Sequence, residues 1–347
     1  VLDVRPSTER DELWIPGSAH IDAYDQLKSG DENALSAFQP TPDTPIVTVC
    51  AAGKTSRIAA AQLRAKGLPA YSLEGGMRAW SLAWNVAEVP VAGLGETKVV
   101  QIRRTGKGCL SYLIGSGDWA AVIDPCLAPR VYIDLAEDKE WKIKLVLETH
   151  IHADHLSRAR SLAERTSATL LYPDQNRLRY EHQTLDDGPI RLSGSTLEAI
   201  HTPGHTWEST CYLLDQKALF TGDTLFLDGV GRPDLHAGAD ERTDKARALY
   251  QSLQRLRRLP PDVLVLPSHT ARPADFDGRP LTSTLRHVYD TVQLLNCSED
   301  EFVGLILART LPTPPNHLKI IEHNEQGEFR EDEVIDLEAG ANRCAVD

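Results

Sequence analysis

The chain has 347 residues, which is too long for one ordinary hydrophobic core and predicts two domains. Hydrophobic residues at 41% and charged residues at 25% are typical of a soluble globular protein. The net charge of −13, without a basic patch, argues against binding to nucleic acid or an anionic membrane, and no apolar run approaches the roughly 18 residues of a spanning helix. Six cysteines without a Cys-x-x-Cys pair indicate a reduced, cytoplasmic location rather than a disulfide framework.

Residues 1–90 alternate between apolar runs and helical stretches. Runs at residues 2–4, 46–49 and 70–73 predict strands, and helical patterns begin near Ile58 and Met77. Because strands alternate with helices, we expect an α/β domain with a parallel sheet. The chain starts at Val1 with no Met, so we expect this domain to be incomplete at its N-terminus.

A second core follows a linker, which we place at residues 91–98, directly after Pro90 and with Gly93 and Gly95 in it. We expect strands at residues 99–103, 111–115, 120–123, 144–147, 169–172, 196–200, 211–214, 218–221 and 263–266. Helices are expected at 156–165 and 245–256, and a C-terminal helical extension over residues 276–347 should contain helices at 284–295 and 299–310. The predicted second domain is therefore residues 99–347.

Cys50 ends a predicted strand, and a tight loop after it opens a helix. Backbone N–H groups converge in such a loop and the helix dipole adds positive potential, so the pKa of the thiol falls and the nucleophilic thiolate is favoured. Lys54 and Arg57 add positive charge and are predicted to bind substrate. The alternative for a single cysteine is a buried residue that only closes the strand.

Four segments around this loop resemble the rhodanese family and occur in its order, at residues 2–5, 15–21, 50–57 and 73–80. The resemblance implies a rhodanese-like domain in which Cys50 is the catalytic nucleophile and carries a persulfide between a sulfur donor and an acceptor. A phosphatase of the same fold requires the pattern Cys-x5-Arg. Here Ser56 occupies the arginine position and Arg57 follows it, so we do not expect a phosphatase.

The strongest sequence signal is a set of histidines and aspartates that follow apolar runs. The candidate metal ligands are His150, His152, Asp154, His155, His205, Asp223 and His269. Burying such a set without a metal ion or mutual pairing would be costly, and loops at one rim of a sheet sandwich can converge on one site. Asp124 is either a supporting residue of this site or a turn residue. The other histidines are interpreted as structural, namely His182, His201, His236, His287, His317 and His323.

This set resembles the metallo-β-lactamase superfamily over about residues 99–275, which implies an αββα sandwich. Segments 222–226, 231–234, 296–302 and 341–344 resemble persulfide dioxygenases. That resemblance implies one Fe(II) per chain, bound by His150, His205 and Asp223, and oxidation of a low-molecular-weight thiol persulfide, such as glutathione persulfide, to sulfite with O2. The other four candidates then orient ligands and water or hold a second metal ion: His152, Asp154, His155 and His269.

The chemistry agrees with the implied ligands, since two histidines and one carboxylate leave open positions on Fe(II) for persulfide and O2. Arg232 follows Asp223 closely and is predicted to bind a carboxylate of the persulfide carrier. Cys344, near the C-terminus, is predicted to pack near the mouth of the metal domain.

Other functions stay open. A dinuclear zinc thioester hydrolase resembling glyoxalase II has the same ligand types and uses zinc-bound hydroxide as its nucleophile. A persulfide sensor or sulfur-carrier scaffold would bind without turnover, and a β-lactamase would rest on fold analogy alone. The expected partners are a small-molecule persulfide or thiol and O2, not nucleic acid or a membrane. A homodimer is a further option.

Overall fold

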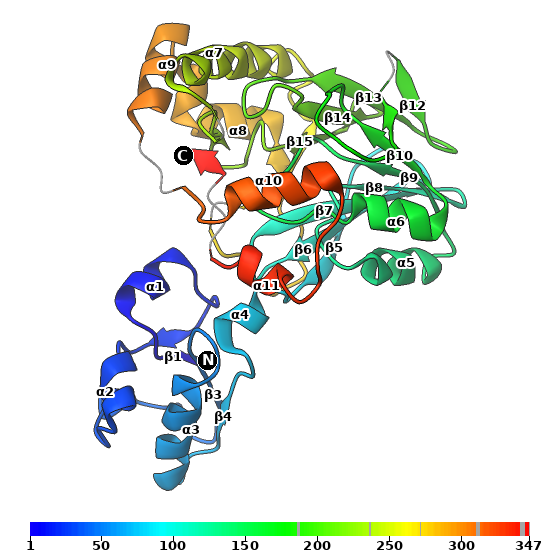
Figure 1. The fold of residues 1–347 in the computed structure, drawn as a ribbon. Helices are drawn as coiled ribbons and strands as arrows, with labels where there is room; N and C mark the ends of the chain where they lie inside the picture. The colour runs from blue at the N-terminus through cyan, green and yellow to red at the C-terminus, as the bar shows by residue number, and fades with distance from the viewer. Residues whose placement is uncertain (186–187, 236, 271, 310–312, 341–343, 347) are drawn as a thin grey trace.

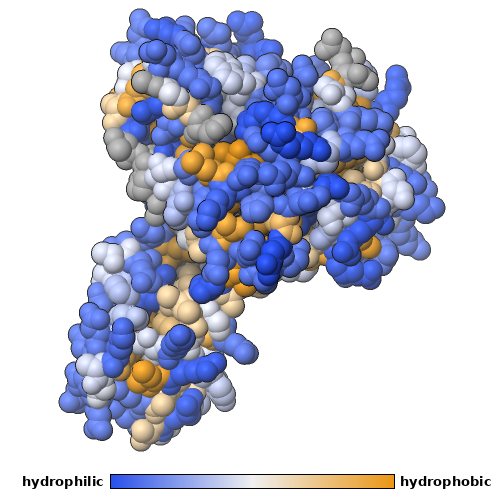
Figure 2. All heavy atoms as spheres, viewed as in Figure 1, coloured by the Kyte–Doolittle hydropathy of each residue, from blue (hydrophilic) through white to orange (hydrophobic). Residues whose placement is uncertain are grey.

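The computed structural model describes residues 1–185, 188–235, 237–270, 272–309, 313–340 and 344–346. Figure 1 shows a small N-terminal domain, in blue, joined to a larger domain built from the rest of the chain. The face drawn in Figure 2 is mainly hydrophilic, and its hydrophobic atoms gather in a few patches in the middle of the larger domain and near the junction of the two domains. Among the described residues, no helix combines the length and apolar character that crossing a membrane requires.

The N-terminal domain contains a parallel sheet in the strand order β2-β1-β3-β4, which confirms the expected α/β sheet. Its strands are β1 (Leu2–Asp3), β2 (Ala19–His20), β3 (Ile46–Val49) and β4 (Ala70–Ser72), and its helices are α1 (Ser7–Glu12), α2 (Tyr24–Ser29), α3 (Thr55–Ala65) and α4 (Gly76–Trp80). Leu2, Leu27 and Leu63 are buried in the core between the sheet and helices α2 and α3. Cys50 directly follows β3, at the edge where the parallel strands end.

The larger domain contains two sheets, with strand orders β11-β10-β9-β8-β7-β6-β5 and β12-β13-β14-β15-β17-β18. The strands of the first sheet are β5 (Asn85–Val89), β6 (Lys98–Arg104), β7 (Cys109–Ser116), β8 (Trp119–Ile123), β9 (Lys142–Leu147), β10 (Thr169–Tyr172) and β11 (Gln183–Thr184). Those of the second are β12 (Pro189–Arg191), β13 (Thr196–His201), β14 (Thr210–Leu214), β15 (Ala218–Gly222), β17 (Leu264–Pro267) and β18 (Ser283–Thr284).

Side chains alternate between an inner and an outer core along these strands, because the strand period is two residues. In β14, Tyr212 and Leu214 pack between the sheets, whereas Cys211 and Leu213 pack against helices on the outside. Helices α5 (Pro129–Glu137) and α6 (Ala159–Thr166) cover one outer face (Figure 1). Helices α7 (Ala239–Leu256), α8 (Leu285–Thr291) and α9 (Glu299–Ala308) cover the other. The expected αββα sandwich is confirmed.

Strand β5 pairs antiparallel with β6 and so belongs to the sheet of the larger domain, although it lies within residues 1–90. The boundaries 1–90, 91–98 and 99–347 stay predictions. The expected helix at 284–295 is divided, since α8 ends at Thr291 and a 3-10 helix η1 (Gln293–Asn296) follows. Helix α7 begins six residues earlier than expected, at Ala239, directly after Gly238.

The C-terminal extension contacts both domains. It includes α10 (His317–Gln326), α11 (Val334–Leu337) and β19 (Ala345–Val346), and β19 pairs antiparallel with β16 (Val230–Gly231). Glu338 is completely buried between these elements, where its carboxylate pairs with Arg104 at 2.5 Å and accepts the Leu156 N–H at 2.7 Å. Because Arg104 also donates to the carbonyl of Ser81 at 2.8 Å, this ion pair links the extension to the end of the N-terminal domain.

Candidate functional site

The loops after strands β9, β13 and β15 bring three of the predicted metal ligands together. Nε2 of His150 lies 3.8 Å from Oδ2 of Asp223, and Nε2 of His205 lies 3.5 Å from the same oxygen. All three residues are at most 2% exposed. β9 lies in one sheet and β13 and β15 lie in the other, so the cluster joins loops from both sheets.

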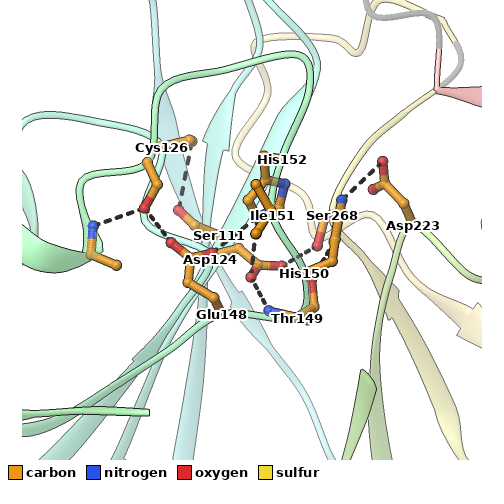
Figure 3. A network of polar contacts seen from close by, with 12 residues as sticks. Ser111, Asp124, Cys126, Glu148, Thr149, His150, Ile151, His152, Asp223 and Ser268 are labelled. Atoms are coloured by element: carbon orange, nitrogen blue, oxygen red, sulfur yellow. Dashed lines mark hydrogen bonds and ion pairs between the residues drawn. The ribbon is translucent and has the colours of Figure 1, made fainter. Parts of the chain in front are cut away.

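Hydrogen bonds fix which ring nitrogen of each histidine faces the cluster. Nδ1 of His205 lies 2.8 Å from the carbonyl oxygen of Arg232, which only accepts, so Nδ1 carries the proton and Nε2 keeps its lone pair. Thr149 Oγ1 donates to Asp124 at 2.9 Å and therefore accepts from Nδ1 of His150, also at 2.9 Å (Figure 3). Both Nε2 atoms are thus prepared as donors to a cation.

The buried atoms of this cluster fit a metal ion. Within the described residues, Nε2 of His150 and Oδ2 of Asp223 have no hydrogen-bond partner, although each is buried. An uncompensated buried polar group costs about 1–3 kcal/mol. The ligand atoms of His150, His205 and Asp223 all lie within 4.8 Å of one another, and two imidazoles with one carboxylate suit a divalent transition metal. Their role as ligands stays a prediction.

A second buried cluster adjoins the first and consists of Cys109, Asp154, His155 and His269. Asp154 lies 3.0 Å from Nδ1 of His155 and 2.8 Å from Nε2 of His269. Nδ1 of His269 approaches Oδ1 of Asp223 to 2.6 Å, an ion-pair contact without hydrogen-bond angles, and this contact joins the two clusters. In the metal-free protein burial lowers the pKa of His269, but Asp154 and Asp223 outweigh it and raise that pKa to about 10.

His152 belongs to a third buried group with two carboxylates. Its Nε2 lies 3.0 Å from Glu148 and 3.4 Å from Asp124, while Nδ1 lacks a hydrogen-bond partner in the described part of the chain. Burial lowers the pKa of His152, but Asp124 and Glu148 together raise it well above its usual value. Burial raises the pKa of Glu148 to about 8. Asp124 also accepts from Ser268 at 2.5 Å, so it is a supporting residue of this site and not only a turn residue.

Two further residues of the sequence analysis, Cys344 and Arg232, lie close to the candidate metal ligands. Cys344 is buried, and its sulfur lies within 4.8 Å of ligand atoms of Asp223 and His269, which confirms that the C-terminal segment packs at the metal site. Residues 341–343 lie outside the described residues. Arg232 is fully buried and donates to both oxygens of Asp234 at 2.7 Å. Its expected contact with substrate stays a prediction.

Cys50 lies in the tight loop between β3 and α3 that its sequence context predicts, and the binding of an anion by this loop stays a prediction. Its sulfur is 3.2 Å from the hydroxyl of Ser56, which is 2.9 Å from Ser72. Burial raises the pKa of the Cys50 thiol, but hydrogen bonds from the Ser56 hydroxyl and from backbone N–H groups of Ser56, Ala52 and Gly53 outweigh this and lower it. Gly76 allows the close approach, because a Cβ there would lie 2.1 Å from the Cys50 carbonyl oxygen.

Lys54 and Arg57 are both exposed at the start of α3, and neither is among the groups that chiefly set the pKa of Cys50. Only their position at the start of α3 therefore supports the predicted contact of Lys54 and Arg57 with substrate. Four of the histidines interpreted as structural bond through a ring nitrogen to backbone carbonyl oxygens: His182, His201, His317 and His323. His236 lies outside the described residues.

Sequence reasoning missed three residues near the metal site. Cys109 begins β7 and joins the second cluster, and Glu148 directly precedes Thr149 and holds His152. Lys245 lies in α7 and lines a hollow with His205. The sequence could have pointed to Glu148, since this residue adjoins the histidine-rich segment. Cys109 and Lys245 are distant in sequence from every candidate ligand, and no sequence feature links them to the site.

Both domains match known families. Residues 1–83 match the family described as rhodanese-like domain, and residues 104–269 match the metallo-beta-lactamase superfamily. The hydroxyacylglutathione hydrolase of Methylococcus capsulatus is 32% identical over 209 residues, which cover 58% of this chain and 78% of that protein. That of Pseudomonas aeruginosa is 34% identical over 152 residues and 43% of this chain, but the chain spans only 56% of its length.

Two solved structures resemble the larger domain. A metallo-beta-lactamase from Staphylococcus aureus has a TM-score of 0.62 and 26% identity, and the match covers 67% of this chain and 74% of that one. ETHE1 from Myxococcus xanthus has a TM-score of 0.56 and 30% identity, and the match covers 65% of this chain and 96% of that one. The chain belongs to the metallo-beta-lactamase superfamily and carries a rhodanese-like domain at its N-terminal end.

Proposed function

We propose that this chain is a persulfide dioxygenase coupled to a sulfurtransferase. It oxidises the outer sulfur of a low-molecular-weight thiol persulfide to sulfite with O2; water supplies the third oxygen atom, and the carrier leaves as the free thiol. The observation that carries the proposal is the combination, in one chain, of a thiol with a lowered pKa at Cys50 and a buried set of two histidines and one carboxylate. The first suits sulfur transfer, and the second suits a mononuclear iron oxygenase.

Cys50 performs the sulfur-transfer step. Its thiolate attacks the outer sulfur of a donor such as thiosulfate, a new sulfur–sulfur bond forms, and sulfite leaves with the electron pair of the broken bond. The backbone N–H groups around Cys50 and the Ser56 hydroxyl then stabilise the persulfide anion. A thiolate acceptor attacks the outer sulfur in turn and releases Cys50 as the thiolate, so the cycle needs no external oxidant. Lys54 and Arg57 attract the anionic donor.

His150, His205 and Asp223 hold the metal in this proposal. Fe(II) bound there supplies open positions for persulfide and O2 and the redox chemistry of the oxidation. Thr149 and the carbonyl of Arg232 keep the Nε2 atoms of the two histidines directed at the metal. The remaining candidates orient the metal ligands and water: His152, Asp154, His155 and His269. Burial of the ligands excludes bulk water from the reacting sulfur.

A dinuclear zinc thioester hydrolase is the alternative. The second cluster, with Asp154, His155 and His269, offers enough donors for a second ion beside the first. The names of the curated relatives, hydroxyacylglutathione hydrolases, support this alternative, whereas the similarity to ETHE1 and the rhodanese-like domain support the dioxygenase. The two functions differ in the number and the identity of the metal ions.

The test is to reconstitute the protein anaerobically with iron, count the metal per chain, and measure O2 uptake and sulfite formation on glutathione persulfide. One iron per chain with persulfide-dependent O2 uptake supports the proposal. His205→Ala should abolish both, whereas His287→Ala, which changes an exposed histidine in helix α8, should leave them intact. Two metals per chain and thioester hydrolysis without O2 uptake would establish the alternative.

A further inference from the structure

A cavity of about 230 Å³ lies beside the Cys50 loop, at the junction of the two domains. The N-terminal domain contributes apolar side chains to its wall, among them Leu13, Ala51 and Met77. Ala339 and Gly340, which belong to the C-terminal extension of the larger domain, form another part of the same wall. Ala51 directly follows Cys50, and the backbone N–H of Met77 donates to the Cys50 carbonyl at 2.9 Å. The larger domain therefore helps to build a cavity that borders the proposed nucleophile.

The part of the wall that comes from the larger domain is held by buried contacts. Lys107 is 5% exposed, and its ammonium group donates to the carbonyl of Glu338 at 2.8 Å and to that of Gly340 at 3.2 Å. These two carbonyl groups lie on either side of Ala339, so the backbone there is fixed while the Ala339 side chain stays exposed. The carboxylate of Glu338 is in turn paired with the buried Arg104.

A second contact holds the two domains together at the same place. Helix α11 lies beside α4 (Figure 1), and Asp336 of α11 forms an ion pair with Arg78 of α4. Arg78 also lines the cavity, and its backbone N–H donates to the Ala51 carbonyl at 3.0 Å. The C-terminal extension is thus attached both to its own domain and to the helix that supports the Cys50 loop.

The size of the cavity and the burial of Cys50 restrict what can reach the sulfur. Pockets that enclose drug-sized ligands have volumes of about 300–1,000 Å³, and about 230 Å³ is below that range. Cys50 is 2% exposed, so an acceptor has to bring its own sulfur into the cavity to meet a persulfide there. A bulky acceptor would press against Ala339 and disturb the contacts that Lys107 makes on either side of it.

We infer that this cavity is the binding site for the sulfur acceptor of Cys50, and that Ala339 of the larger domain limits its size. The acceptor is accordingly a thiol about as small as a single amino acid, not a tripeptide or a larger thiol. Its thiolate attacks the outer sulfur of the Cys50 persulfide, a new sulfur–sulfur bond forms, and Cys50 leaves as the thiolate with the electron pair of the broken bond. This inference rests on the proposed function for the role of Cys50 and adds the acceptor site and the size class of the acceptor.

The first test does not depend on turnover. The full-length chain is treated with iodoacetamide or with the bulkier fluorescein maleimide, and modification of Cys50 is followed by mass spectrometry of its peptide. Cys297, a partly exposed cysteine of the larger domain, is the internal reference. Relative to Cys297, Cys50 should react far faster with the small reagent than with the bulky one. Ala339→Trp should slow the reaction of Cys50 with iodoacetamide by about tenfold, because the indole ring fills the cavity.

The second test measures sulfur transfer from thiosulfate to cyanide, 2-mercaptoethanol and glutathione. The value of kcat/KM for each acceptor, divided by its ionised fraction, reports the acceptor step alone. The unaltered protein should favour 2-mercaptoethanol over glutathione by at least about tenfold, which corresponds to about 1.4 kcal/mol. Ala339→Trp should lower kcat/KM for 2-mercaptoethanol by about tenfold and that for the diatomic cyanide by no more than about threefold.

Ala65→Trp is the matched control, because it makes the same substitution at an exposed alanine at the end of α3, outside the cavity. It should change no rate by more than about twofold. If Ala339→Trp fails to fold, Ala339→Leu should show the same order of effects on a smaller scale.

The inference is overturned if glutathione accepts sulfur as well as 2-mercaptoethanol does, or if Ala339→Trp leaves all rates unchanged or lowers them all equally. These results would leave Cys50 as the nucleophile. A chain that shows the expected size dependence of alkylation but transfers no sulfur from thiosulfate would instead disprove the role of Cys50 in the proposed function, and the acceptor site with it.

Discussion

Thr149 offers a sharp test of how the metal site is held. Its hydroxyl donates to Asp124 and accepts from Nδ1 of His150, with both contacts at 2.9 Å, and the residue is completely buried. Thr149→Val keeps the shape of the side chain and removes both hydrogen bonds. The backbone N–H of Thr149 still donates to Asp124 at 2.8 Å, and Ser268 still donates to the same carboxylate (Figure 3).

The loss therefore falls on His150 and not on Asp124. The Nδ1 proton of His150 loses its acceptor, and one buried unsatisfied donor costs about 1–3 kcal/mol. The ring is also free to rotate or to exchange tautomers, and loss of such a supporting contact typically weakens metal binding by about 10–100-fold. A hundredfold loss corresponds to about 2.7 kcal/mol, which agrees with the cost of the lost hydrogen bond.

Metal affinity is measured by competition with a chelator of known strength, and stability of the metal-free protein by denaturant unfolding. Thr149→Ser is the control, because it keeps the hydroxyl and removes only a methyl group. It should bind metal within about threefold of the unaltered protein, at a stability cost of about 1 kcal/mol. If Thr149→Val retains metal as tightly as Thr149→Ser, the hydroxyl does not orient His150 and the reasoning fails.

Three further predictions concern the N-terminal domain and the link between the domains. Cys50→Ser should abolish sulfur transfer from thiosulfate while persulfide-dependent O2 uptake persists, and unchanged transfer would exclude Cys50 as the nucleophile. Ser56→Ala should raise the pKa of Cys50, because the Ser56 hydroxyl helps to lower that pKa. The acid limb of the pH profile of sulfur transfer should then move to higher pH, and a profile that does not move would exclude this hydrogen bond as a cause of the lowered pKa. Glu338→Ala should leave the buried Arg104 charge unpaired and lower the free energy of unfolding by about 3–5 kcal/mol, and a loss below about 1 kcal/mol in denaturant titrations would contradict that role.

Several strands were not predicted from the sequence, either because they are very short or because their neighbours suggested a linker. Strands β11, β16, β18 and β19 contain only two residues each, too few to display a period of two. Strand β5 alternates exposed and buried residues, but the proline and glycine residues that follow it favoured the interpretation as a linker. Its pairing with β6 depends on the neighbouring sheet and not on its own sequence.

The sequence by itself determined which residues stand at the ends of strands. Cys50, His150 and Asp223 each follow an apolar run within a residue or a few residues, so local chain chemistry was enough to place them on loops at a sheet edge. Their residue types, a thiol in a tight loop and a set of histidines with a carboxylate, were enough to predict sulfur transfer and a metal site.

Only the tertiary structure decided what surrounds those residues. Cys109, Lys245 and Cys344 lie far from the ligands along the chain, and they reach the site because two sheets and a returning C-terminal segment pack together. The direction of each imidazole was likewise undetermined, since it depends on acceptors such as the carbonyl of Arg232. Periodicity along the chain reports local burial, whereas contacts between distant segments arise only once the layers close around a common core.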